Sequence, residues 1–547
     1  MIFRSFRSSF FALCLGLVLV QPLIQPVMAQ KRPDLRGTDR LTAAQLKAYL
    51  TFIASDELEG RDTPSRGLNV AAKFIAAMLE RWGVKPAGEQ GTYFQKFDVQ
   101  TEQLDPARCS VVLNNRSFLY GKEYFAPNAL VKCGGVIEPT QLVYAGDGCY
   151  VKATGQEPLK GLEVQGKIVV INSLFPPQPA PQDTKSGTDW LDPISYARQN
   201  GAVGIISLMP RKTSFSELQS YIGQAQPVVQ GIPPEYPIDR DEFPVIVAGE
   251  TLSRALFAGE KYDLDAVLNA AGASGSMPSF AFAPDKRFSM TLAIDQVRMP
   301  TRNVIGVLEG SDPVLKNEYV AISAHYDHVG IGPANATGDT IYNGADDDGS
   351  GTVTVLAIAE TLASLKIRPK RSILFIWHTG EEQGLWGSIY FTGHPTVPLD
   401  RITSLINIDM IGRSRKFDDS NPRNAELSGQ NEIYLIGTTL MSTEFEQLFR
   451  RVNQQYLNLT YNYKYDDPKD PNKFFFRSDH YSYAKKGIPA AFYFDGEHED
   501  YHRLGDEVDK IDFDKMQKVA RTIYRSLWEL AELKVRPKVD KQLPEGF

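Results

Sequence analysis

Asp346, Asp347 and Asp348 stand in a row between glycines in the stretch YNGADDDGSG, residues 342–351. Three neighbouring carboxylates repel one another, and Asp and Gly are poor formers of helices and strands. In isolation the triplet therefore predicts a solvated loop. A divalent cation makes such carboxylates attractive instead, because Asp and Glu oxygens bind hard and borderline cations. Other ligands elsewhere in the chain must decide between these interpretations.

Three further segments place imidazoles or carboxylates at or just after apolar runs, and a fourth lies before the last predicted helix. They are His325 and Asp327 after the run 318–324, Glu381 and Glu382 after 372–377, Asp409 after 403–408, and His502 in DYHRLGDE. Each residue alone has an ordinary structural explanation, such as a Glu pair at a helix N-terminus. Together with the aspartate triplet they predict a metal site. The carboxylates are too numerous for a single tetrahedral zinc and suit two zinc ions that share one carboxylate, about 3.5–4 Å apart.

The elements that must position these residues follow a regular order after about residue 300. Continuous apolar runs, such as EYVAISAH and SILFIWH, alternate with helical patterns such as TVTVLAIAETLASL. This alternation predicts an α/β fold with a mostly parallel, mixed central sheet covered by helices on both faces. Functional groups gather at the carboxyl ends of strands in such sheets, and there the candidate ligands lie.

Helical patterns also begin and end the folded part of the chain. Residues at helical spacing predict two amphipathic N-terminal helices and one at the C-terminus. They are Leu46, Leu50 and Ile53 for the first, Val70, Phe74, Met78 and Trp82 for the second, and Met516, Val519, Ile523, Leu527 and Leu530 for the last. Between about residues 105 and 290, short β-rich runs separated by Pro and Gly predict an inserted, smaller β-rich domain.

Residues 1–29 predict a signal peptide. Arg4 and Arg7 precede an apolar run from Phe10 to Val20, and Val27, Met28 and Ala29 form a small-residue cleavage site. We therefore expect export to a periplasmic or extracellular location, with no membrane span after the signal is removed. Pairing among Cys109, Cys133 and Cys149 in an oxidising compartment stays open.

The charge distribution argues against nucleic acid as a partner. The net charge of the 547-residue chain is −7, basic and acidic residues are interspersed, and Lys and Arg form no cluster. The sequence does not indicate an oligomeric state.

Five motifs, in order, resemble the co-catalytic di-zinc aminopeptidase family, whose relatives include glutamate carboxypeptidase, glutaminyl cyclase and the transferrin receptor. The motifs are ISAHYDHVG, NGADDDGSGT, GEEQGLWGS, NIDMIG and YHRLGDEVDKID. The insert, with GKIVVI and ARQNGAVGIISL, resembles a protease-associated domain. The resemblance implies that residues 30–104 and 291–547 form one peptidase domain, interrupted by the insert at 105–290.

The resemblance also implies a role for each site residue. His325 and Asp409 would bind one zinc ion, Glu382 and His502 the other, and Asp347 would bridge them. Glu381 would be the general base for a metal-bridged hydroxide, and Tyr501 would stabilise the oxyanion. Asp327 would accept the other ring N–H of His325 and orient it.

His328, His378, His394 and His498 are predicted to be structural or to lie on the surface. His480 lies in FFFRSDHYSYAKKGIP, a segment that the resemblance makes a wall of the substrate pocket. Ser478, Asp479 and His480 are adjacent in sequence and lack a GxSxG elbow, so a hydrolase triad is not expected.

The predicted function is a secreted zinc aminopeptidase that hydrolyses N-terminal residues of peptides with a free N-terminus. A carboxypeptidase of the glutamate carboxypeptidase type would need basic residues to bind a C-terminal carboxylate. Arg413, Arg415 and Arg477 are candidates for this role, so a carboxypeptidase remains an alternative. A non-catalytic binding protein on the same scaffold should have lost ligands, whereas the full set is present. A cyclase and a di-zinc phosphatase are less favoured. The preferred side chain of the substrate stays open.

Overall fold

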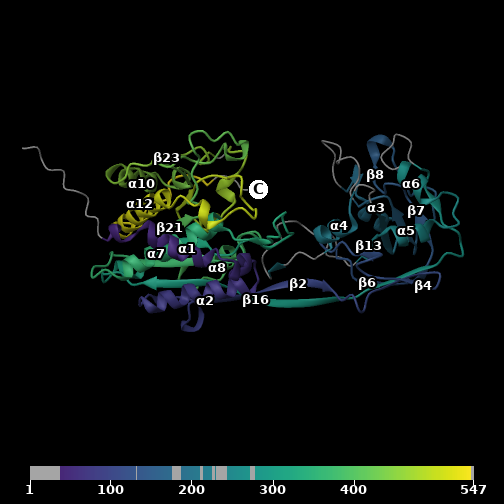
Figure 1. Cartoon of the computed structure of the whole chain (residues 1–547), viewed down its shortest axis with the longest axis horizontal. Coiled ribbons are helices and arrows are strands. Elements are labelled where there is room, and N and C mark those ends of the chain that lie inside the picture. The colour runs from purple at the N-terminus through teal and green to yellow at the C-terminus, as the bar shows by residue number, and fades with distance from the viewer. Residues whose placement is uncertain are drawn as a thin grey trace, which may run out of the picture. The chain divides into compact units, whose positions relative to one another are not determined.

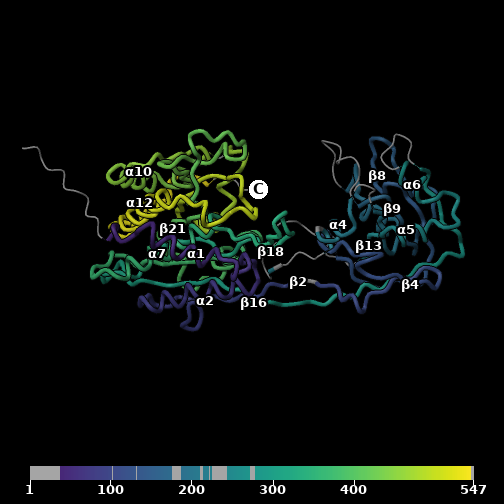
Figure 2. The backbone as a smooth tube through the Cα atoms, in the orientation of Figure 1, coloured from purple at the N-terminus to yellow at the C-terminus, as the bar shows by residue number. Residues whose placement is uncertain are grey.

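The computed structural model describes residues 37–130, 132–174, 187–209, 213–223, 228–229, 243–270, 277–467 and 469–543. The predicted signal peptide, residues 1–29, lies outside this part of the chain. Among the described residues, no helix is both long and apolar enough to cross a membrane. Figure 1 labels the elements, and Figure 2 traces the backbone.

A mixed ten-stranded sheet organises the part of the chain that carries the candidate ligands. Its strands, in spatial order, are β12 (Val228–Val229), β2 (Phe94–Leu104), β16 (Ile294–Leu308), β20 (Ser372–His378), β17 (Tyr319–His325), β21 (Ile402–Ile408), β24 (Ala490–Phe494), β22 (Glu432–Ile436) and β23 (Thr460–Asn462), with β1 (Lys85–Pro86) paired to β16. The four central strands, β20, β17, β21 and β24, run parallel to their neighbours within this group. The predicted α/β class with a mixed sheet is confirmed, but the sheet is not mostly parallel, because four of its strand pairings are parallel and five are antiparallel.

Helices cover both faces of this sheet, because the central strands are apolar on both sides. In β17, Val320, Ile322 and Ala324 pack into the core beneath one helical layer, whereas Ala321 packs on the opposite face. The first layer contains α1 (Ala43–Ile53), α2 (Arg66–Arg81), α7 (Gly351–Ala363), α10 (Thr443–Gln455) and α12 (Phe513–Glu532). The second contains α8 (Trp386–Gly393) and α11 (His480–Ala484), which contribute Phe391 and Tyr483 to the other core.

The three predicted amphipathic helices correspond to α1, α2 and α12. The buried face of α2 differs from the predicted stripe. Its fully buried residues are Leu68, Ala71, Ala72, Ile75 and Leu79, whereas Val70 is exposed and Phe74, Met78 and Trp82 pack at the margin of the core. The buried face therefore includes small residues and leaves the large side chains of the predicted stripe at its edge.

The region between β2 and β16 has sheets and a core of its own. A six-stranded sheet has the order β14 (Phe280–Ala281), β7 (Leu142–Tyr144), β9 (Ile168–Ile171), β11 (Gly204–Leu208), β13 (Val245–Ala248) and β5 (Tyr124–Phe125). A four-stranded antiparallel sheet has the order β4 (Arg116–Phe118), β3 (Ser110–Leu113), β15 (Phe288–Leu292) and β6 (Gly135–Thr140). The helices here are α3 (Pro193–Gln199), α4 (Phe215–Ile222), α5 (Glu250–Phe257) and α6 (Leu264–Ala270).

β2 and β16 form the two antiparallel connections to this region, paired from Phe94 with Val304 to Leu104 with Ile294. Within the described residues no disulfide bond joins Cys109, Cys133 or Cys149. The boundaries 30–104, 105–290 and 291–547 and the protease-associated assignment of the insert stay predictions.

Candidate metal centre

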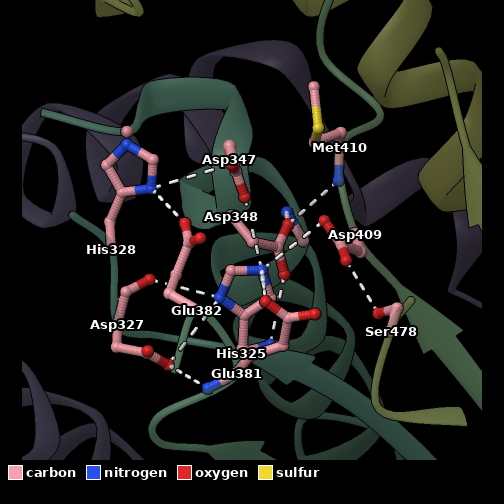
Figure 3. Close-up of polar contacts among 12 residues, drawn as sticks. His325, Asp327, His328, Asp347, Asp348, Glu381, Glu382, Asp409, Met410 and Ser478 are labelled. Carbon is pink, nitrogen blue, oxygen red and sulfur yellow. Dashed lines mark hydrogen bonds and ion pairs between the residues drawn. The ribbon is translucent and has the colours of Figure 1, made fainter. Parts of the chain in front are cut away.

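Parallel strands bring the candidate ligands to one edge of the sheet. His325 is the last residue of β17 and is in register with His378, the last residue of β20. Glu381 and Glu382 follow β20, and Asp409 follows β21, which is paired in parallel with β17. The aspartate triplet lies in the irregular turn Ala345–Ser350, which leads directly into α7. Figure 3 shows these side chains converging.

The solvated-loop interpretation of the aspartate triplet is wrong. Asp346 and Asp348 are 0% exposed and Asp347 is 3% exposed. Burying three adjacent carboxylates is costly unless each is paired with donors or a cation. Each of the three aspartates has separate partners. Asp347 belongs to the site itself, whereas Asp346 and Asp348 support it.

One group of three residues could hold a cation at His325. Its Nε2 atom lies 3.3 Å from Asp347 Oδ1 and 3.5 Å from Asp409 Oδ1. Two ligands of one tetrahedral zinc, each about 2.0–2.2 Å from the metal, are separated by about 3.4 Å. His325 Nε2 is buried and has no hydrogen-bond partner among the residues described. The spacing of these three atoms is therefore that of ligands around one cation, rather than that of hydrogen-bond partners of one another.

A second group lies on the other side of Asp347. His502 Nε2 lies 2.8 Å from Glu382 Oε2 and 3.1 Å from Asp347 Oδ2. Asp347 thus presents one carboxylate oxygen to each imidazole, as a bridging ligand must. Burial opposes ionisation of Asp347, but the contacts with His325 and His502 hold its pKa well below the ordinary value. The carboxylate is consequently charged at neutral pH.

His328 also contacts this second group, so it does not lie on the surface, and it has a carboxylate partner that its position in the sequence does not indicate. Its Nδ1 atom lies 2.7 Å from Glu382 Oε1 and 3.7 Å from Asp347 Oδ2, and the ring is fully buried. Figure 3 shows the imidazole pointing at Glu382. The signal in the sequence was the spacing HYDH, which places a second imidazole three residues after His325.

Glu381 lies beside the first group, but its carboxylate is farther from His325 than those of Asp347 and Asp409. Its Oε2 atom is 3.8 Å from His325 Nε2. Burial raises the pKa of Glu381 well above the ordinary value; His325 opposes the shift, and Asp409 and Glu382 add to it. A carboxylate in this environment takes up a proton readily, which is the property needed in a general base.

Asp327 is at the site, but its carboxylate is not the hydrogen-bond partner of His325. His325 Nδ1 lies 3.2 Å from the Asp327 backbone carbonyl oxygen, whereas the Asp327 carboxylate is 3.8 Å away. The Asp327 carboxylate instead accepts the backbone N–H of Glu381 at 3.3 Å. Asp327 therefore orients His325 through its main chain and Glu381 through its side chain.

Asp346 and Asp348 hold the backbone around Asp347. Asp346 accepts the backbone N–H of Gly412 at 2.6 Å. Asp348 accepts the backbone N–H groups of His325 and Met410, each at 3.2 Å. These bonds tie the turn to the ends of β17 and β21 and leave only the Asp347 carboxylate to bridge the two groups.

Asp506 connects the aspartate turn to the segment that carries His502. Its carboxylate accepts the backbone N–H groups of Asp346 and Asp347 at 3.0 Å. Arg413 lies 3.7 Å from the same carboxylate and 2.9 Å from Asp500. This network positions His502 relative to Asp347, and sequence reasoning did not find it because its members are far apart in the chain.

A relay of hydrogen bonds orients Asp409. Ser478 Oγ donates to Asp409 Oδ2 at 2.7 Å, and Asn407 Nδ2 donates to Ser478 Oγ at 2.8 Å. The remaining oxygen, Oδ1, faces His325. This geometry excludes Ser478 from a triad with His480, whose ring stacks on Phe492 at 4.7 Å.

Ser478→Ala should weaken cation binding at the His325 group about 10–100-fold, because Asp409 loses the donor that fixes its orientation. The affinity is measured by competition with a chelator. Ser482→Ala, which removes another buried hydroxyl bonded to Ser388, is the matched control and should bind normally. Equal affinity in both variants would contradict the role of Ser478.

Arg61 is a structural residue of the site that sequence reasoning missed. Its buried guanidinium donates to the carbonyl oxygens of Tyr326, Asn343 and Gly344 at 3.0, 2.7 and 2.9 Å, and also to that of Ile53. Burial lowers the pKa of Arg61 to about 10, so the side chain stays cationic at neutral pH. It joins the segment after β17 to the segment that leads into the aspartate turn.

Arg61→Met should reduce the free energy of unfolding by at least about 3 kcal/mol, because several buried carbonyl oxygens lose their donor. Thermal unfolding of the purified protein measures this. The exposed Arg66, at the start of α2, provides the control, and Arg66→Met should change the stability by no more than about 0.5 kcal/mol. Equal melting temperatures for the two variants would exclude the anchoring role.

A cavity opens onto the two groups. It is lined by Asp347, Glu381, Glu382, Asp409, Met410, Phe474, Arg477, Phe492, Phe494, Glu497 and Tyr501. Tyr501 stacks on the His502 ring with centroids 4.0 Å apart, so the phenol lies at the second group. Arg477 is at the cavity and is paired with Glu497 at 2.9 Å.

Part of the chain is similar to a known protein family. Residues 303–527 match the sequence model described as Peptidase family M28. The chain therefore carries a Peptidase family M28 domain, and this span contains every residue of the two groups.

The chain is similar to leucine aminopeptidase 2 of Trichophyton rubrum, with 27% identity over 270 residues, covering 44% of this chain and 48% of the relative. It is also similar to a probable leucine aminopeptidase 2 of Aspergillus oryzae, with 30% identity over 205 residues, covering 37% and 35% respectively. The chain thus spans between about a third and a half of the length of these curated relatives. A zinc aminopeptidase structure from Bacillus subtilis aligns with 17% identity and a TM-score of 0.49, over 92% of this chain and 99% of that one.

Proposed function

We propose that this protein is an exported metal-dependent aminopeptidase that holds two zinc ions and removes N-terminal residues from peptides. The observation that carries the proposal is the Asp347 carboxylate, whose two oxygens face His325 and His502, with Glu381 beside them. His325, Asp347 and Asp409 would hold one ion, and Asp347, Glu382 and His502 the other.

The buried donor set fits the cations. In the described part of the chain, His325 Nε2 and Asp347 Oδ2 are buried atoms without a hydrogen-bond partner, and the carboxylates of Asp409 and Glu382 lie with them in the two groups. When bound, paired zinc ions polarise a carbonyl group and lower the pKa of water toward neutrality. Glu381 would accept the proton of the attacking water and return it to the leaving amine. Tyr501, at the edge of the cavity, would donate its phenol O–H to the developing oxyanion.

Arg413, Arg415 and Arg477 could have bound the C-terminal carboxylate of a carboxypeptidase substrate, but their contacts give little support for that function. Arg413 is buried and paired with Asp500. Arg415 donates to the backbone carbonyl oxygens of Ala425 and Asp419. Arg477 lies at the cavity, but Glu497 neutralises it. Bound zinc ions would offset most of the carboxylates that line the cavity, so the charge of the lining does not by itself select one end of a peptide. The aminopeptidase is favoured because each of the three arginines is already bonded to a carboxylate or to the backbone, which leaves none of them to bind a C-terminal carboxylate.

One peptide in three forms tests the proposal: unblocked, N-acetylated and C-amidated. The zinc-loaded protein is incubated with each form, and mass spectrometry identifies the end that shortens. We expect loss of N-terminal residues from the unblocked and C-amidated peptides and none from the N-acetylated peptide.

Shortening that only amidation prevents would assign the protein to the carboxypeptidase branch. No cleavage of any form by protein with two bound ions would contradict the peptidase proposal and favour a binding role.

The proposed export rests on the signal peptide predicted at residues 1–29, with Arg4, Arg7 and the apolar run Phe10–Val20. Expression of the full chain and N-terminal sequencing of the mature protein test it, and a new N-terminus at Gln30 in the exported fraction is expected.

A further inference from the structure

We propose that His328 is a positioning residue of the second cation site. Its Nδ1–H group holds Glu382 Oε1, so that Glu382 Oε2 is directed at the same cation as His502 Nε2. The inference rests on the two-cation site of the proposed function and adds to it a third imidazole.

The two oxygens of Glu382 are divided between two imidazoles. Oε1 lies 2.7 Å from His328 Nδ1, and Oε2 lies 2.8 Å from His502 Nε2. Both are distances of charge-assisted N–H···O⁻ hydrogen bonds, so the contacts with Glu382 alone do not distinguish a ligand from a positioning residue. A carboxylate held at one oxygen in this way can offer only the other oxygen to a cation.

The distances to Asp347 distinguish the two imidazoles. His502 Nε2 lies 3.1 Å from Asp347 Oδ2 and therefore approaches both carboxylates of the second group. His328 Nδ1 is 3.7 Å from the same atom, so it lies near both carboxylates but is 0.6 Å farther than His502 from the Asp347 oxygen. The His502 side chain is 40% exposed and that of His328 is 0% exposed. A catalytic cation needs a position open to water and substrate, so it belongs on the His502 side.

The hydrogen-bond pattern around His328 agrees with a donor at Nδ1. Nε2 is buried and has no hydrogen-bond partner in the described ranges. A neutral imidazole carries one N–H group. Placing that hydrogen on Nδ1 satisfies Glu382 and leaves only a lone pair, rather than a buried N–H group, without a partner at Nε2.

The backbone around His328 clamps the ring in this orientation. A Cβ atom at Gly344, whose φ is +57°, would lie 2.5 Å from His328 Cδ2 and Cγ, so the segment before the aspartate turn closes directly over the imidazole. The backbone N–H of His328 donates to the carbonyl oxygen of Arg61 at 3.2 Å. Because Arg61 also binds the carbonyl oxygens of Asn343 and Gly344, the ring and the segment above it share one anchor.

Metal binding by four variants and the wild type tests the proposal: His328→Ala, His328→Asn, His502→Ala and His480→Asn. Zinc per chain is measured after dialysis, and the Kd of each ion is measured by chelator competition. The amide of Asn places an N–H group near the position of His328 Nδ1. His480 is another fully buried histidine and contacts aromatic rings instead of the carboxylates, so it controls for the loss of a buried imidazole.

We expect His328→Ala to bind the first ion normally and the second about 10–100-fold more weakly, the usual effect of removing a group that orients a ligand. His328→Asn should restore most of this affinity. His502→Ala should lose the second ion altogether, and His480→Asn should bind both ions. Circular dichroism verifies the fold of each variant, and His328→Asn tests the proposal even if His328→Ala does not fold.

Unchanged binding of the second ion by a folded His328→Ala would overturn the proposal. Loss of the second ion from His328→Asn, to the same extent as from His502→Ala, would also overturn it and would make His328 a direct ligand. A wild-type protein that binds fewer than two ions would contradict both this inference and the two-zinc centre. A wild-type protein that binds two ions but cleaves no peptide would contradict the peptidase proposal alone, because the affinities of the His328 variants decide the positioning role without any substrate.

Discussion

Glu381→Gln is expected to reduce kcat about 10²–10⁴-fold, the usual contribution of a general base, while both metal ions remain bound. The substitution keeps the size of the side chain and removes only its ability to accept a proton. Glu381 lies 3.8 Å from His325 and belongs to neither three-residue cation group, so metal binding does not need its charge.

The measurement combines steady-state kinetics on the unblocked peptide with zinc content per chain. Glu382→Gln is the matched comparison at the neighbouring position, because Glu382 contacts His328 and His502 and its loss should remove the second ion. Near-normal turnover in Glu381→Gln would remove Glu381 from the mechanism. Loss of metal from Glu381→Gln would make it a ligand rather than a base.

Asp347→Asn is expected to release both cations and to abolish activity. An amide nitrogen in place of one oxygen can serve only one of the two groups, and the negative charge shared between them disappears. His325 and His502 would then each face a site that has lost its common ligand. Zinc analysis after dialysis gives the result directly, and circular dichroism shows that the fold persists.

Asp346→Asn and Asp348→Asn are the controls for position within the triplet. Both side chains accept backbone N–H groups, so their substitution should lower stability while metal content stays near two ions. If either variant lost its metals while Asp347→Asn kept them, the bridging role would belong to that neighbour.

Much of the site could be predicted from the sequence, because its positions follow from local patterns. Apolar runs that alternate with helical patterns indicate parallel strands, and parallel strands end at the same edge of a sheet. His325, Glu382 and Asp409 could therefore be expected to meet although they are up to 84 residues apart (409 − 325). The choice of Asp347 within the triplet came from family resemblance rather than from the pattern.

Several features depended on contacts that no local pattern reveals. The contact of His328 with Glu382 is not predictable from local sequence, because Glu382 is 54 residues further along the chain and the orientation of His328 depends on Gly344 and Arg61. The partner of His325 Nδ1 proved to be the main chain of Asp327, because the direction of a side chain after a strand depends on the turn that follows. The buried face of α2 likewise depended on which of its residues pack into the core.

By itself the sequence determined the α/β class, the alternation of elements and the residue types at the strand ends, since all three arise from local periodicity and composition. Only the tertiary structure decided which oxygen faces which imidazole, which carboxylates bind backbone N–H groups, and which arginines are neutralised. Those outcomes depend on side-chain directions and on packing between segments distant in the chain, and hydrogen bonds and ion pairs are sensitive to differences of a few tenths of an ångström.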